Sequence, residues 1–71
     1  MRKRSITIDG HQTSISLEDE FWEELAAVAK QRGLSLNGLV AEVDKARVGA
    51  NLSSALRVYV LKQVRRKISR A

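Results

Sequence analysis

The chain of 71 residues has no cysteine and no proline, and it contains one Phe, one Trp and one Tyr. Without cysteine, no disulfide can cross-link the fold and no cysteine-based zinc site can form. The absence of cysteine is compatible with the reducing cytoplasm, where we expect this protein to act. No apolar run approaches the roughly 20 residues that a membrane-spanning helix needs, so we expect no membrane partner.

The length and the lack of disulfides together limit how stable a lone copy of this chain can be. A domain of this size buries only about 60% of the surface that its unfolded chain exposes. Association with a second copy is the remaining common way to enlarge the core. We therefore expect a single domain over residues 1–71 that forms a homodimer or a tetramer.

Charge is distributed unevenly along the chain, whose formal net charge is +5. Residues 17–48 carry seven acids and four bases, whereas residues 49–71 carry six bases and no acid. A basic balance favours nucleic acid or an anionic membrane surface as the partner, although it also serves solubility. We expect nucleic acid, because residues 52–61 lack the clean polar face of a membrane-surface helix.

Few residues of this chain are suited to catalysis or to metal binding. His11 is the single histidine, and a nucleophile would need such a base held in place by a third group. A metal site would rest on Asp9, His11 and distant acids, and no glycine-rich phosphate loop is present. We therefore expect no enzyme activity, no metal and no cofactor, and an ordinary surface position for His11.

Two short stretches, residues 5–8 and 12–17, alternate apolar and polar side chains as β-strands do. The apolar residues fall on even positions in the first stretch and on odd positions in the second. Asp9-Gly10 between them is typical of a two-residue hairpin turn, which would bring the apolar residues to one face. A β-bulge at Gly10 would also restore the alternation, and a flexible basic arm over residues 1–10 is the third alternative.

The second of these stretches has one face suited to a core and one face of uncharged hydrogen-bonding groups. The first face consists of Thr13, Ile15 and Leu17. The second face consists of Gln12, Ser14 and Ser16. The second face is either a solvated strand surface or a surface that contacts another molecule.

The remaining sequence predicts three helices, over residues 19–32, 36–47 and 52–67. The first has an apolar arc and an acidic first turn, which the helix dipole favours, and Gly33 is placed to end it. Ser35 is a suitable N-cap for the second helix, and Gly49 is placed to end that helix. Asn51 or Ser53 would cap the third. The apolar arcs of the first two helices contain Phe21, Trp22, Leu25, Ala26, Val28 and Ala29, and Leu36, Leu39, Val40, Val43 and Ala46.

The third predicted helix changes character along its length. Its first half, residues 52–61, is apolar nearly all round, as expected of a helix that is buried on several sides. In so small a protein, part of that cover would come from another chain. Its second half, from Lys62 to Arg70, is strongly basic and is either a phosphate-contacting surface or a solvated helix end.

The order of these elements and one stretch of sequence resemble a known family. The stretch TSISLEDEFWEELAAVAKQRGLSLNGLVAEV, residues 13–43, combines an alternating strand, an acidic first helical turn, an apolar stripe and the turn G-L-S. It resembles the ribbon-helix-helix fold of Arc- and MetJ-type repressors and many antitoxins. The whole chain also resembles a bacterial ribbon-helix-helix subfamily in which GHQTSISLEDEFW and NLSSALRVYVL recur. The resemblance implies a mostly α fold with a short N-terminal β element, an intertwined dimer and an extra C-terminal helix.

In that family, two chains contribute one strand each to an antiparallel ribbon that enters the DNA major groove. The resemblance implies that the face formed by Gln12, Ser14 and Ser16 contacts base edges. It also implies phosphate contacts by Ser35 and by the backbone N–H groups of Leu36 and Asn37. A basic arm of Arg2, Lys3 and Arg4 would track the phosphates or reach the minor groove.

The function implied by the resemblance is that of a sequence-specific, homodimeric transcriptional repressor. The alternative is a protein-interaction module, antitoxin-like or a scaffold dimer, that keeps the fold without entering the groove. A hairpin at Asp9-Gly10 bears on this choice, because it would add an outer strand on each side of the ribbon. Four strands spaced about 4.8 Å apart are wider than the major groove, which is about 12 Å wide.

Overall fold

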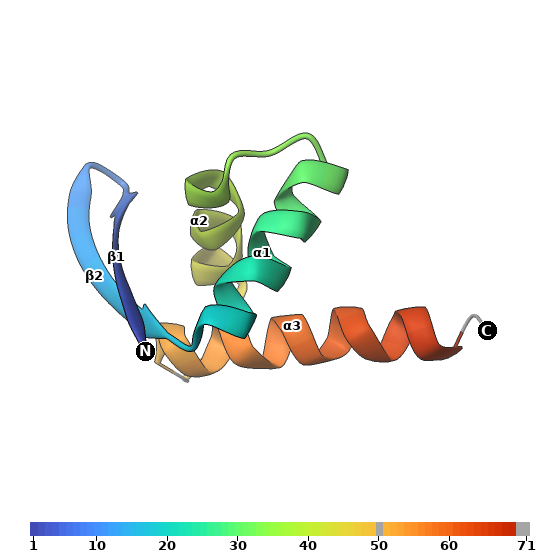
Figure 1. Ribbon diagram of the computed structural model, residues 1–71. Helices are drawn as coiled ribbons and strands as arrows, with labels where there is room; N and C mark the ends of the chain where they lie inside the picture. Colours follow the sequence, from blue (N-terminus) through green and yellow to red (C-terminus); the bar gives the residue numbers. More distant parts are fainter. Residues whose placement is uncertain (50, 70–71) are drawn as a thin grey trace.

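The computed structural model describes residues 1–49 and 51–69. Two strands, β1 (Arg2–Ile8) and β2 (His11–Leu17), precede three helices, α1 (Asp19–Gln31), α2 (Leu36–Ala46) and α3 (Leu52–Ser69). The three helices lie where the sequence predicts them, with bounds that differ by one or two residues. The twisted hairpin covers one side of α2, and α3 passes beneath the other elements and extends beyond α1 (Figure 1).

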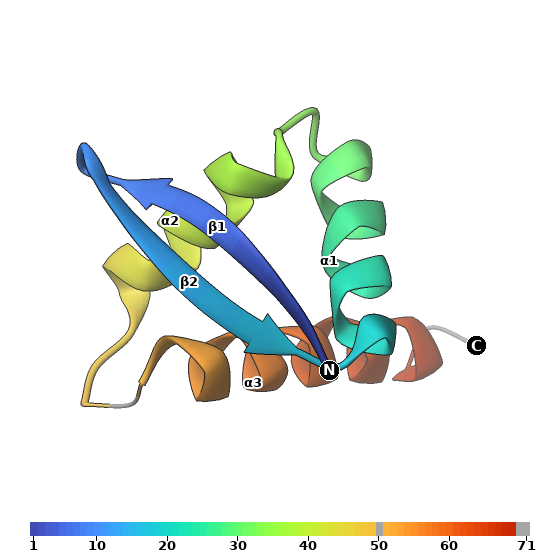
Figure 2. The same cartoon turned by 60° about the vertical axis from the view of Figure 1, so that its left-hand side comes forward.

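Residues 2–17 form an antiparallel hairpin, which is one of the three arrangements that the sequence allows. Asp9 and Gly10 have φ values of 51° and 79°, as a two-residue turn with both central residues left-handed requires. The turn pairs Ile8 with His11 and continues to the pair of Arg2 and Leu17. The ribbon is therefore formed within one chain, whereas the resemblance implies one strand from each of two chains. Figure 2 shows the hairpin face-on, in front of α2.

The hydrophobic core lies between the inner face of the hairpin and the three helices. It confirms most of the predicted apolar faces, although Thr13, Ala26 and Ala46 are exposed. Phe21 and Leu36 are only partly buried and pack against the core. The buried side chains are Ile6, Ile15, Leu17, Trp22, Leu25, Val28, Ala29, Leu39, Val40, Val43, Leu56 and Val60.

The ends of the helices show which of the predicted caps are used. Gly33 has a φ of 70° and directly follows Arg32, the C-cap residue of α1. It ends the helix, as predicted. The Ser35 hydroxyl accepts a hydrogen bond from the Gly38 N–H (2.9 Å), and Asn51 Oδ1 accepts one from the Ser54 N–H (2.8 Å), so Asn51 caps α3. The prediction that Gly49 ends α2 is wrong, because the backbone already becomes extended directly after Ala46.

Burial of α3 is less complete within one chain than its sequence predicts. Among the described side chains of α3, only Leu56 and Val60 are buried, whereas 49% of Val58 and 53% of Leu61 remain exposed. The helix contacts β2, α1 and α2, and its two buried residues, four positions apart, lie on one side of the helix. No element of residues 1–49 and 51–69 covers the other side, so Val58 and Leu61 face solvent within one chain.

Two hydrogen-bonded contacts attach the hairpin to the helices. The Thr7 N–H donates to Asn37 Oδ1 (2.9 Å), and Asn37 Nδ2 donates to the Thr7 carbonyl (2.7 Å), so one side chain pairs with both backbone groups of a β1 residue. At the other end of β1, Trp22 Nε1 donates to the Arg2 carbonyl (2.8 Å). These contacts hold β1 against α1 and against the first turn of α2.

Two surface ion pairs join the helices to one another. Arg32 donates to Glu42 Oε1 (3.0 Å) and to the Tyr59 hydroxyl (3.4 Å), which connects the end of α1 with α2 and α3. Arg57 of α3 donates to Glu18 Oε1 (3.0 Å), at the N-cap of α1. All five residues have exposed or partly exposed side chains, so each pair contributes only a small share of the stability.

Acid is expected to weaken these ion pairs. Hydrogen bonds from Arg32 hold the pKa of Glu42 below its ordinary value of 4.5. A hydrogen bond with its own backbone N–H, and then Arg57, lower the pKa of Glu18. A carboxyl whose pKa is lower in the folded state stabilises the fold above its unfolded pKa, and the contribution disappears as the pH falls through the folded pKa. We expect Tm, followed by circular dichroism, to be constant near neutral pH and to decline below about pH 4.5.

The Glu42→Gln variant serves as the control for this pH dependence. Glutamine keeps the size of the side chain but does not titrate, so Tm of the variant should decline less steeply in acid. An identical acid dependence in both proteins would show that the ion pair of Glu42 has no part in it.

Candidate nucleic-acid interface

The hairpin presents one exposed face away from the helices, which we call the outer face. The register places Lys3 opposite Ser16, Ser5 opposite Ser14, and Thr7 opposite Gln12. Because side chains alternate along a strand, all six point to the same side of the sheet. Every one of them is exposed. The outer face consists of Lys3, Ser5, Thr7, Gln12, Ser14 and Ser16.

The chemistry of the outer face is that of a surface that forms hydrogen bonds rather than a surface that attracts by charge. It carries four hydroxyl groups, one amide and one ammonium group. Hydroxyl and amide groups both donate and accept hydrogen bonds, so they can pair with donors as well as acceptors of another molecule. Asp9, which lies at the turn, is the only acid among residues 1–17. An anionic partner that approaches the outer face therefore meets no acidic side chain on that face.

The structure brings the three predicted base-contacting residues, Gln12, Ser14 and Ser16, to the outer face. Sequence reasoning did not identify Ser5 and Thr7 as members of the same face. The signal for them is the Asp9-Gly10 turn, because a two-residue hairpin loop fixes which residues of β1 lie opposite Gln12 and Ser14.

The three basic residues predicted as an arm belong to β1, and only one of them lies on the outer face. Lys3 does, whereas Arg2 and Arg4 are turned toward α1. Arg2 Nε lies 3.4 Å from Asp19 Oδ1, and the Arg4 guanidinium lies 5.7 Å from the centroid of the Trp22 ring. The flexible-arm alternative is therefore not the arrangement seen here.

The start of α2 adjoins the edge of β1. Ser35 and Asn37 already use their side chains, on the Gly38 N–H and on Thr7 respectively. The first N–H groups of a helix have no partner within the helix, so the N–H groups of Leu36 and Asn37 are available to an acceptor beyond the N-terminus of α2. The contact between Asn37 and Thr7 places these groups beside the outer face, near the hairpin turn.

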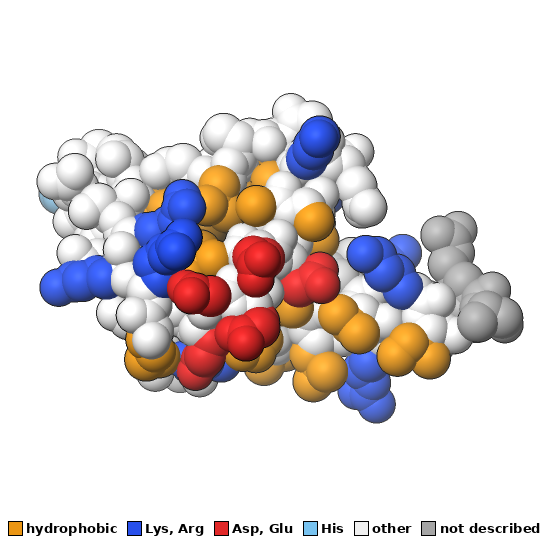
Figure 3. Space-filling model, in the orientation of Figure 1, with side chains coloured by type: hydrophobic (Ala, Val, Ile, Leu, Met, Phe, Trp, Pro, Cys, Tyr) orange, Lys and Arg blue, Asp and Glu red, His pale blue; other side chains and the backbone are white. Residues whose placement is uncertain are grey.

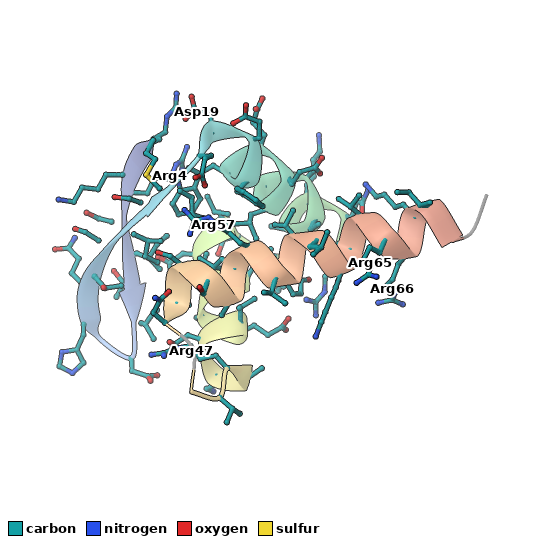
Figure 4. The ribbon with its side chains drawn as sticks, turned by 90° about the horizontal axis from the view of Figure 1, so that it is seen from below. Arg4, Asp19, Arg47, Arg57, Arg65 and Arg66 are labelled. Atoms are coloured by element: carbon teal, nitrogen blue, oxygen red, sulfur yellow. The ribbon has the colours of Figure 1, made fainter. Side chains whose placement is uncertain are left out.

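The basic end of α3 lies far from the outer face. Figure 4 shows Arg65 and Arg66 at the opposite end of the molecule from the hairpin. Lys62 and Lys67 belong to the same end of the helix and are also exposed. This group and the outer face of one chain therefore cannot contact the same short segment of a partner.

Over residues 1–49 and 51–69, no group of three or more His, Cys, Asp or Glu residues is arranged to hold a metal ion. None of the helices in the described ranges is long and apolar enough to cross a membrane.

A family model described as a ribbon-helix-helix domain matches residues 1–64, which include both strands, α1, α2 and most of α3. No curated protein and no solved structure matches the chain. Proteins with this domain are regulatory DNA-binding proteins and typically bind DNA as dimers.

Proposed function

The chain belongs to the ribbon-helix-helix family, and we propose that it is a sequence-specific DNA-binding protein that inserts the outer face of its hairpin into the major groove. We further propose that it acts as a homodimer and represses transcription by occupying its DNA site. The observation that carries this proposal is the exposed face of six hydrogen-bonding side chains on a two-stranded ribbon.

The dimensions of the hairpin suit the groove. Two strands lie about 4.8 Å apart, and the major groove is about 12 Å wide and admits a two-stranded ribbon. Two hairpins joined edge to edge would form four strands, which the groove does not admit. We therefore propose that each chain inserts its own hairpin, in place of a ribbon shared between two chains.

The side chains of the outer face match groups on base edges. Gln12 can form two hydrogen bonds with adenine, at N6 and N7, and Lys3 can donate to O6 and N7 of guanine. The hydroxyls of Ser14 and Ser16 can donate to or accept from several bases. A face with a single charge discriminates by hydrogen-bond pattern, which is what sequence-specific recognition needs.

Phosphate contacts would come from both sides of the hairpin. The free N–H groups of Leu36 and Asn37 at the start of α2 suit a phosphate, because they lie at the positive end of the helix dipole. Arg2 is paired with Asp19 at the surface, and such exposed pairs contribute about 0–1 kcal/mol. A phosphate can therefore replace Asp19 as the partner of Arg2 at little cost.

The first experiment is selection from a random pool of duplex DNA at about 150 mM salt, a concentration at which weak phosphate-only binding is largely suppressed. We expect enrichment of a short common sequence. Retention of DNA without enrichment would mean that basic residues hold the phosphate backbone without reading bases. No retention at all would overturn the proposal and favour binding to another protein.

The Ser14→Ala/Ser16→Ala double variant tests the assignment of the outer face. Each lost pair of specific contacts costs about 1–3 kcal/mol, so we expect affinity for the selected sequence to fall at least about tenfold. Binding to unrelated DNA should change little, since phosphate contacts are retained. Fluorescence anisotropy with both duplexes measures the two effects.

Ser54→Ala is the matched control for this double variant. Ser54 is an exposed serine in the first turn of α3 and does not belong to the hairpin. Its substitution removes the same hydroxyl group and should leave both affinities unchanged. If the double variant binds the selected sequence as well as the control does, the outer face does not read the bases.

A further inference from the structure

One side of α3 carries a row of side chains that the rest of the described chain covers only in part, since Arg57 and Val64 are partly buried whereas Leu61 and Ile68 are exposed. Arg57, Leu61, Val64 and Ile68 follow one another at intervals of four, three and four residues, the spacing at which two helices pack along a common line. The exposed fractions of Leu61 and Ile68 are 53% and 69%. Val58, exposed to 49%, lies beside this row. We call this row the α3 seam.

The α3 seam opens into a groove of about 320 Å³ between α3 and the start of α1. The groove has an ordered wall, because Arg57 pairs with Glu18 (3.0 Å) and its guanidinium lies 5.8 Å from the centroid of the Phe21 ring. The only charged side chain of the lining is thus already neutralised by a partner. The groove is lined by Phe21, Arg57, Val58, Val60, Leu61 and Val64.

Charges of opposite sign lie at the two ends of the α3 seam. Figure 3 shows acidic side chains gathered over the start of α1, next to hydrophobic side chains along α3. Basic side chains occupy the far end of α3 in the same view. The acidic group consists of Glu18, Asp19, Glu20, Glu23 and Glu24. The basic group consists of Arg65 and Lys67, which flank the α3 seam, whereas Lys62 and Arg66 lie on other sides of the helix.

We propose that the α3 seam and the groove beside it form the interface between two copies of this chain, with the two α3 helices packed antiparallel. A surface that is acidic at one end, apolar in the middle and basic at the other end is complementary to itself under a two-fold rotation. The rotation brings the basic group of each copy onto the acidic group of the other. A parallel arrangement would place like charges together, which disfavours it.

The spacing of the α3 seam locates the two-fold axis. A two-fold axis midway between Leu61 and Val64 places Leu61 of each copy against Val64 of the other. It also places Arg57 beside the partner's Ile68, so the apolar stem of the arginine packs while its guanidinium stays with Glu18. The partner's last turns then cover Val58 and the groove, which supplies the cover that α3 lacks within one chain.

This pairing leaves both hairpins free. The hairpin lies at one end of the molecule and the last turns of α3 lie at the other (Figure 1). The interface therefore shares no residue with the outer face, and it can be tested without DNA. A failure of the DNA-binding proposal would not affect it.

The experiment is a mass measurement by light scattering on the protein without DNA, at tens of micromolar. We expect the wild type to show twice the chain mass of 7.9 kDa. Leu61→Asp places a charge in the middle of the α3 seam and should halve that mass. Because Leu61 is half exposed within one chain, the helical circular dichroism signal should be retained.

Val48→Asp is the control, since Val48 is 92% exposed and lies outside the α3 seam. It introduces the same charge and should leave the dimer intact. A monomeric wild type would overturn the proposal. A Leu61→Asp protein that keeps the dimeric mass would also overturn it and would point to association elsewhere, such as along the open edge of β2.

Charge reversal tests the antiparallel arrangement directly. Glu20→Lys/Glu24→Lys reverses the net charge of the acids that have no ion-pair partner among the described residues, since Glu18 and Asp19 are already paired with Arg57 and Arg2. Arg65→Glu/Lys67→Glu reverses the charge of the basic group. Each variant alone should be monomeric because like charges meet in its own dimer. An equal mixture of the two should form dimers again, since both ends of the mixed pair carry opposite charges. A mixture that stays monomeric while both variants are folded would refute the antiparallel arrangement.

Discussion

The Ile15→Asp variant is expected to be unfolded at room temperature. Ile15 is 3% exposed and lies on the inner face of the hairpin, in the core shared with the helices. An aspartate at this position would lose the apolar contacts of isoleucine, at about 2 kcal/mol. It would also need either to bury a carboxylate without a partner or to hold it protonated, which costs several kcal/mol more. The free energy of unfolding of a domain of this length is about 4–10 kcal/mol.

Ser14→Asp is the matched control for Ile15→Asp. The two positions are adjacent on β2, but Ser14 points to the outer face and is exposed. The same charge there should change Tm by only a few degrees, because the carboxylate remains in water. Thermal denaturation followed by circular dichroism separates the two variants. A cooperative transition of Ile15→Asp near that of the wild type would mean that the two faces of the hairpin are assigned the wrong way round.

The second large effect is expected at Trp22, the only tryptophan. Its side chain is 3% exposed, packs in the core and donates a hydrogen bond to the Arg2 carbonyl (2.8 Å). Trp22→Ala would leave a cavity between α1 and the hairpin, and changes of this size cost about 3–5 kcal/mol. It would also remove the ring over which the Arg4 guanidinium lies. We expect the loss of most of the stability, measured as the midpoint of urea denaturation.

Trp22→Phe separates packing from hydrogen bonding at the same position. Phenylalanine keeps an aromatic ring in the core and removes the indole N–H, which leaves the Arg2 carbonyl without this donor. We expect a loss of about 1–2 kcal/mol, well below that of Trp22→Ala. Equal losses in the two variants would show that the hydrogen bond to β1, rather than the volume of the ring, is what Trp22 contributes.

The local features of this fold could be predicted from the sequence because they depend on neighbouring residues. The Asp9-Gly10 turn, the Ser35 cap and the apolar faces of α1 and α2 all rest on spacings of two to four residues. The end of α2 differs from the prediction although its signal is also local. Gly49 carries the usual signal for a helix end, but the chain leaves the helix at Arg47, before that signal is reached.

The features that could not be predicted are contacts between residues far apart in the sequence. The pairing of Asn37 with Thr7 and of Trp22 with Arg2 depends on how the hairpin docks on the helices. An asparagine in the first turn of a helix does not indicate that its side chain bonds a strand, and an arginine in a strand does not indicate that its carbonyl accepts from a tryptophan. The same holds for the candidate site. The alternation of residues places Gln12, Ser14 and Ser16 on one face, but it does not predict that Arg2 and Arg4 lie against α1.

The pairing of Asn37 with Thr7 has a consequence for the behaviour of this protein at high concentration. A hairpin has two free edges, and a sheet that can add strands at both edges can grow into a fibril. Here the side chain of Asn37 occupies the backbone groups of Thr7 and lays the first turn of α2 along the edge of β1. Another strand therefore cannot pair with β1 at Thr7 unless it displaces Asn37, so one asparagine hinders growth of the sheet at this end of the β1 edge.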